Sequence, residues 1–126
     1  MDHELRTGDC RELIASVAAS SVSLVLTDPP SGHNNNDGDL IANWEAALGK
    51  GKSGEARPIA NDGPEANDLL AEVLPEIRRV LEPNGCCCCC CSGGGGPDPQ
   101  FARWSMMLDG VLNFKHMVVW DKGPMG

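Results

Sequence analysis

The chain has 126 residues, of which 41% are apolar, and its formal net charge is −8. This length fits one domain, and the acidic balance argues against a surface that binds nucleic acid through clustered lysines and arginines. The sequence has no run of 18 apolar residues and no charged-then-apolar leader, so we expect a cytoplasmic protein.

The N-terminal part of the sequence predicts a strand, a helix and a second strand. Residues 4–7 fit a short strand, and residues 11–17 fit a helix with Asp9 as its N-cap. The nearly continuous apolar run over residues 22–27 predicts a strand that is covered on both faces. A strand, a helix and a strand within about thirty residues form the βαβ pattern of α/β folds.

A polar stretch over residues 32–63 follows the second predicted strand. It is long for a connection in a compact domain, which predicts a functional or mobile loop. Apolar residues at helical spacing around Trp44 predict one short helix within it. Residues 49–54 match G-x-G-x-x-G, but a helical pattern precedes them instead of a strand, which argues against a dinucleotide site.

The second half of the sequence alternates between helices and strands. Residues 64–81 have a helical apolar pattern, which Pro75 is expected to kink or split. A turn is expected at residues 82–85, and a later helix begins at Asp98 and Pro99, with Trp104 facing the core. A last strand is predicted over residues 115–120.

Residues 86–91 are six consecutive cysteines, which we expect to form a buried strand. Because side chains alternate along a strand, three sulfurs point to each face, and four do not converge on one zinc ion. Free cysteine packs like a small hydrophobe, so a central strand covered on both faces suits this run. A structural role is therefore favoured, and we predict no metal site unless another segment supplies ligands.

Four pieces of the sequence form a pattern: Gly8-Asp9-Cys10, Thr27-Asp28-Pro29-Pro30, Val80-Leu81-Glu82-Pro83-Asn84-Gly85 and Val118-Val119-Trp120-Asp121-Lys122-Gly123. In their order and rough spacing they resemble the amino-methylating DNA methyltransferases, which methylate adenine N6 or cytosine N4 and have a class I Rossmann-like fold. The resemblance implies S-adenosylmethionine as methyl donor, DNA with a flipped-out base as substrate, and a prokaryotic or phage source.

The resemblance also implies roles for individual residues. The Asp28 carboxylate and the Pro29 carbonyl would accept the two N–H groups of the target amine, and aspartate at this position favours adenine N6. Asp9 and Cys10 match a family position near the adenine of the cofactor, although Asp9 is explained equally well as a helix cap. The implied catalytic segment is Asp28, Pro29, Pro30 and Ser31.

Two features differ from the family pattern. Ser31 occupies the position of an aromatic residue that stacks on the flipped base, and the family's F-x-G-x-G cofactor loop has no match after a strand. In permuted members that loop follows the W-D-K-G strand. We therefore expect residues 1–126 to form a partial methyltransferase sheet, inactive until a complementary chain or domain supplies the loop. The alternative is a non-catalytic remnant or interaction module with the same fold.

Overall fold

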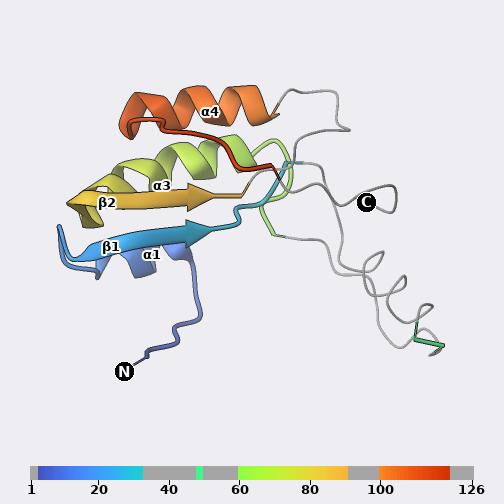
Figure 1. The fold of residues 1–126 in the computed structure, drawn as a ribbon. Helices are drawn as coiled ribbons and strands as arrows, with labels where there is room; N and C mark the ends of the chain where they lie inside the picture. Colours follow the sequence, from blue (N-terminus) through green and yellow to red (C-terminus); the bar gives the residue numbers. More distant parts are fainter. Residues whose placement is uncertain (1–2, 33–47, 50–59, 91–99, 120–126) are drawn as a thin grey trace.

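A computed structural model describes residues 3–32, 48–49, 60–90 and 100–119 (Figure 1). Within these ranges the fold is mixed α/β, with helices beside a small sheet of two parallel strands. The α/β class expected from the sequence is confirmed at this level. The elements in chain order are α1 (Cys10–Ala15), β1 (Val22–Thr27), α3 (Ala66–Val80), β2 (Leu81–Cys89) and α4 (Gln100–Val111).

The two strands pair over the apolar run of β1 and the cysteines of β2. Thr27 lies opposite Cys89, and the Thr27 carbonyl accepts a hydrogen bond from the Cys90 N–H at 2.8 Å. Residues 82–85, which were predicted to form a turn, lie inside β2. Val22 pairs with Leu81 and Leu24 pairs with Cys86, so these four residues lie opposite Ser23 alone and the register shifts there. At Gly85 a Cβ would come within 2.9 Å of the Val22 carbonyl oxygen, so this irregular stretch requires glycine.

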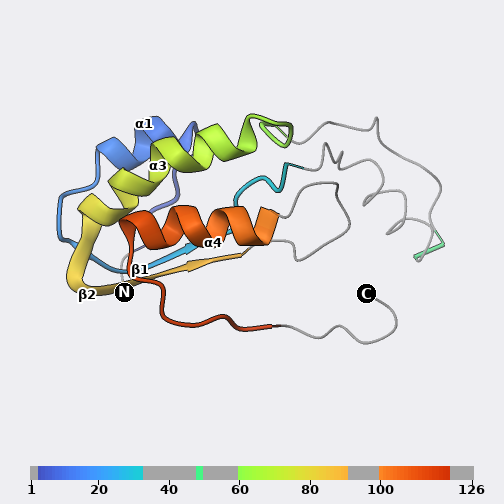
Figure 2. The ribbon, with the colours of Figure 1, turned by 90° about the horizontal axis from the view of Figure 1, so that it is seen from above.

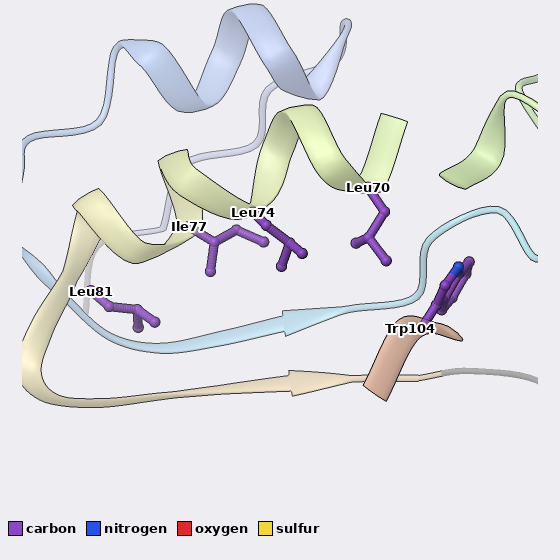
Figure 3. Packing of buried hydrophobic residues seen from close by; sticks show 5 residues of the cluster. All are labelled: Leu70, Leu74, Ile77, Leu81 and Trp104. Carbon is purple, nitrogen blue, oxygen red and sulfur yellow. The ribbon is translucent and has the colours of Figure 1, made fainter. Parts of the chain in front are cut away.

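The hydrophobic core lies between α3 and the strands. Leu70, Leu74 and Ile77 of α3 are at most 3% exposed and cluster with Leu81 and Trp104. Figure 3 shows the three α3 side chains pointing toward the sheet. The apolar face predicted for residues 64–81 is therefore confirmed.

Pro75 does not split α3, which continues as one helix from Ala66 to Val80. Proline removes one backbone hydrogen bond, but the buried side chains on either side of it, Leu74 and Ile77, are fixed by tertiary packing. Of the two outcomes expected at Pro75, a kink or a split, the split is wrong for that reason.

The α4 helix adds the largest buried side chain to the core. Trp104 is 1% exposed, and its indole N–H donates to the Asn67 side-chain oxygen of α3 at 2.8 Å. Leu108 and Val111 pack partly buried against the same cluster. The core face predicted for this helix is confirmed at these positions, whereas its expected start at residues 98–99 lies outside the described residues.

Two predicted strands are absent from the described residues. Residues 4–7 and residues 115–119 have no strand structure. Arg6 instead bonds the Glu4 carboxylate and, at 2.7 Å, the Ser16 hydroxyl, so side chains and not a backbone ladder hold the first segment. The second segment runs in the same direction as β2 (Figure 1), yet Val118 is 85% exposed. Position 120 lies outside the described residues.

The described helices cover only one face of the sheet, which corrects the prediction that both faces are covered. Figure 2 shows α1 and α3 together on one side of the two strands. Cys87 and Cys89 pack partly buried against the core, as strand alternation predicts. The exposed side chains of the opposite face are Leu24, Leu26, Cys86, Cys88 and Cys90.

This one-sided coverage predicts unequal thiol reactivity along β2. Burial raises the pKa of the Cys87 thiol, so less of the reactive thiolate is present there at pH 7 to 8. Alkylation with iodoacetamide, followed residue by residue with tandem mass spectrometry, is expected to label Cys86 and Cys88 faster than Cys87. Equal rates at Cys87 and Cys88 would contradict the described packing.

No helix among the described residues is long and apolar enough to cross a membrane. The predicted short helix around Trp44 and most of the G-x-G-x-x-G stretch fall outside those residues.

Candidate functional site

The carboxyl ends of the two parallel strands define the candidate site. Both strands end at the same edge of the sheet, and α1, α3 and α4 begin at that edge because they run antiparallel to the strands (Figure 1). In open α/β folds, ligands bind outside the carboxyl ends of the strands. The segment that follows β1 lies at this edge.

The first residue of that segment is Asp28, whose side chain is exposed directly after the last residue of β1. Pro29 and Pro30 follow and are half-buried. Neither proline has a backbone N–H, and both have a φ fixed near −65°. This segment therefore has an exposed carboxylate at position 28 and no backbone donor at positions 29 and 30.

Ser31 lies in a hydrogen-bonded loop after the two prolines. Its hydroxyl donates to Oδ1 of Asp62 at 3.0 Å, and the Gly32 N–H donates to the same oxygen at 2.7 Å. Asp62 is 2% exposed, so the Ser31 side chain is directed into the protein. Sequence reasoning missed Asp62, although the Asn61-Asp62-Gly63-Pro64 turn before α3 gives a signal for a structured loop.

Gln100, the first residue of α4, contacts the same loop from another direction. Its Nε2 donates to the Ser31 carbonyl oxygen at 3.1 Å, and the residue is 8% exposed. Its Oε1 is buried and has no hydrogen-bond partner among the described residues. No sequence pattern marks Gln100 as part of a site.

Asp9 and Cys10 lie at the start of α1, at the same edge of the sheet (Figure 1). Asp9 is the N-cap, as predicted, because Oδ1 accepts the Arg11 N–H at 2.9 Å. The Arg11 guanidinium also bonds both carboxylate oxygens of Asp9, and reaches Glu72 at 3.2 Å. Hydrogen bonds from the Arg11 side chain, and then from its backbone, lower the Asp9 pKa from 3.8 to about 2.

This lowered pKa predicts a pH dependence of stability. A carboxyl group whose folded pKa is below its unfolded value stabilises the fold above the unfolded pKa, and the contribution disappears as the pH falls through the folded value. We expect the melting temperature of wild type to be higher than that of Asp9→Asn at pH 5 to 7. This difference in melting temperature is expected to vanish as the pH falls from 3.8 toward 2. A difference that persists unchanged down to pH 2 would contradict the Asp9–Arg11 pairing.

A shallow cavity of about 650 Å³ lies beside α1. Its lining residues include Arg6, Cys10, Leu13 and Val17. The depression is largely open to solvent, and its lining is mostly apolar. Asp9 is not among the lining residues, because its carboxylate faces Arg11.

The edge thus brings together the Asp28–Ser31 segment, Asp62 and Gln100, with the start of α1 at the same end of the sheet. Among residues 3–32, 48–49, 60–90 and 100–119, no three His, Cys, Asp or Glu side chains gather in a metal-binding arrangement. Comparison of the chain with protein-family models, curated proteins and solved structures finds no match. The comparisons therefore assign no chemistry to this edge.

Proposed function

We propose that the chain is the catalytic region of a DNA amino-methyltransferase, with a partial class I Rossmann-like sheet and S-adenosylmethionine as the methyl donor. The observation on which this depends is the exposed Asp28 carboxylate at the carboxyl edge of a parallel sheet, followed by two prolines. Together with the resemblance of the Asp-Pro-Pro motif to that family, this position supports the proposal.

The proposed chemistry explains why two acceptors are needed. The lone pair of an exocyclic amine is delocalised into the base, so the amine is a poor nucleophile. When the Asp28 carboxylate and the Pro29 carbonyl accept its two N–H groups, they favour the pyramidal form, whose lone pair attacks the methyl carbon. The cationic product then releases a proton to water, so the main contributions of the site are positioning and charge stabilisation.

S-adenosylmethionine would supply an electrophilic methyl group, and its sulfonium sulfur would keep the electron pair of the broken S–CH3 bond as a neutral thioether. The resemblance implies that Asp9 and Cys10 lie near its adenine. We propose that Cys10 makes this contact, since it lines the cavity beside α1, while Asp9 acts through the cap that orients the helix start. A complementary chain or domain contributes the glycine-rich loop.

Adenine N6 is the favoured target, because the motif begins with aspartate. The net charge of −8 disfavours DNA binding by this chain alone, so most phosphate contacts are assigned to the complementary region. The target base reaches the edge only after it is flipped out of the duplex.

The second candidate is a non-catalytic module that keeps this fold. Ser31 favours it, because serine has no aromatic ring to stack on the base at this position, and its hydroxyl is bonded to Asp62. Stacking contributes about 1 to 3 kcal/mol per base where it has been measured by truncation. Its loss at Ser31 weakens base capture and does not remove the two amine acceptors.

The test is methyl transfer from isotope-labelled S-adenosylmethionine to DNA, with the complementary region present and the nucleosides analysed by mass spectrometry. We expect label in N6-methyladenine. A completed protein that binds the cofactor and the DNA but forms neither N6-methyladenine nor N4-methylcytosine would favour the non-catalytic module.

A further inference from the structure

The loop that follows β1, residues 28–32, forms hydrogen bonds with two residues outside it, Asp62 and Gln100. The geometry points to a positioning role for these two residues. We propose that Asp62 and Gln100 hold this loop so that the Asp28 carboxylate and the Pro29 carbonyl keep one orientation at the sheet edge. The inference rests on the proposed function for its catalytic meaning, but its structural content is testable without methyl transfer.

The two residues fix opposite ends of one peptide group. The Ser31 carbonyl accepts from Nε2 of Gln100 at 3.1 Å, and the N–H of the same peptide unit, on Gly32, donates to Asp62 at 2.7 Å. A planar peptide that is bonded on both sides, from two different segments, has little freedom to rotate. The Ser31 hydroxyl adds a third bond to the same carboxylate oxygen at 3.0 Å.

Burial makes these bonds effective. Asp62 is 2% exposed and Gln100 is 8% exposed, so water competes little for their polar atoms. A low local dielectric strengthens hydrogen bonds between such buried groups. The loop is thus attached to the start of α4 and to the turn before α3, and both segments join core helices.

The attachment extends to Asp28 because the intervening chain is short and stiff. At its other end the Thr27 carbonyl is bonded to the Cys90 N–H at 2.8 Å, as part of the strand pairing. Only residues 28–30 lie between Thr27 and Ser31, and two of them are prolines with fixed φ. Holding both ends of this bridge therefore restricts the orientation of Asp28.

Gly32 is the residue that allows the Gln100 side-chain amide to lie close to the loop backbone. Its φ is +76°, in the region that favours glycine, and a Cβ there would lie 2.6 Å from Nε2 of Gln100. A side chain at position 32 would therefore strain the backbone and displace the Gln100 amide. The close approach is consistent with a loop shaped around Gln100.

The experiment is ¹⁵N relaxation on the full chain, comparing wild type with Asp62→Ala, Asp62→Asn and Gln100→Met. In wild type we expect order parameters near about 0.85 at Asp28, Ser31 and Gly32, as in rigid backbone, and values below about 0.6 in Asp62→Ala. Gln100→Met keeps the side-chain volume and loses the donor, so it is expected to loosen the same residues. Asp62→Asn retains an acceptor oxygen and is expected to restore part of the order.

The matched control is Asp68→Ala, which removes an exposed carboxylate from the first turn of α3 and is expected to leave the loop unchanged. Unchanged order parameters at Asp28 and Gly32 in folded Asp62→Ala and Gln100→Met would overturn the proposal. If Asp62→Ala fails to fold, Gln100→Met and Asp62→Asn decide the question by the same criterion.

Methyl transfer separates this proposal from the proposed function. In the completed protein, Gln100→Met is expected to lower kcat while the KM for S-adenosylmethionine stays unchanged, because the amine acceptors and not the cofactor contacts are displaced. Wild type without transfer would contradict the methyltransferase assignment, and the relaxation result would still decide whether Asp62 and Gln100 position Asp28.

Discussion

Replacing Asp28 with alanine is expected to reduce methyl transfer to DNA by at least about 10²-fold to 10³-fold, the loss seen when one preorganised polar group is removed from a reacting centre. The variant keeps the Pro29 carbonyl but loses the charged acceptor at the end of β1. Asp28 is exposed and follows the last strand residue, so we expect the fold to remain intact. The measurement is the labelled-methyl assay in the presence of the complementary region, together with the melting temperature.

Two further variants define the interpretation of that result. Asp28→Asn keeps one acceptor oxygen without the charge, and its rate is expected between those of wild type and Asp28→Ala. Asp68→Ala removes a carboxylate that is exposed on α3 and is expected to transfer methyl groups at the wild-type rate. Transfer by Asp28→Ala within a few-fold of wild type would refute the role assigned to this carboxylate.

Replacing Trp104 with alanine is expected to lower the free energy of unfolding by about 3 to 5 kcal/mol, the usual cost of truncating a buried aromatic side chain. Trp104 is 1% exposed, lies in the main hydrophobic cluster and joins α4 to α3 through Asn67. Domains of this size are typically stable by only about 5 to 15 kcal/mol, so the variant is expected to be near its folding threshold. Urea denaturation followed by circular dichroism measures the effect.

Controls on the same helix separate ring packing from the hydrogen bond. Trp104→Phe retains an aromatic ring but leaves the Asn67 side-chain oxygen without this donor, which is expected to cost about 1 to 3 kcal/mol. Met106→Ala truncates a side chain that is 74% exposed and is expected to change stability by no more than about 0.5 kcal/mol. A loss below 1 kcal/mol for Trp104→Ala would contradict the described core, since it is less than about a third of that truncation cost.

The sequence predicts the elements whose patterns are local and strong. The apolar run of β1 and the helical spacing of Leu70, Leu74 and Ile77 are patterns within single segments, and they predict one strand and one helix face. The Asp9 cap is likewise local, since it bonds the N–H two residues later. These predictions are confirmed because short-range physics determines them.

The predictions that failed depend on partners distant in the sequence. A strand exists only where another strand pairs with it, and residues 4–7 and 115–119 have no such partner among the described residues. The alternation of the cysteines follows from strand geometry, but whether Cys88 is covered depends on where the helices pack.

The contacts of the candidate site were missed for the same reason. Ser31 and Asp62 are 31 positions apart, and Gln100 is 69 positions from Ser31. No local pattern of residues joins them, and they meet only because α3 and α4 begin at the edge where β1 ends. The motif itself was visible in the sequence, while the residues that hold it were not.

The most direct test of the central claim, that Asp28 accepts an exocyclic amine, is the carboxyl ¹³C resonance of Asp28 during titration with nucleosides. Adenosine provides the amine, and purine riboside is the same ring system without it. We predict that adenosine shifts the Asp28 resonance saturably and that purine riboside causes no comparable shift. Adenosine is also expected to shift resonances of residues next to Asp28 in wild type, and these shifts are expected to be lost in Asp28→Ala. An equal response to both nucleosides, or no response to adenosine, would contradict the assignment.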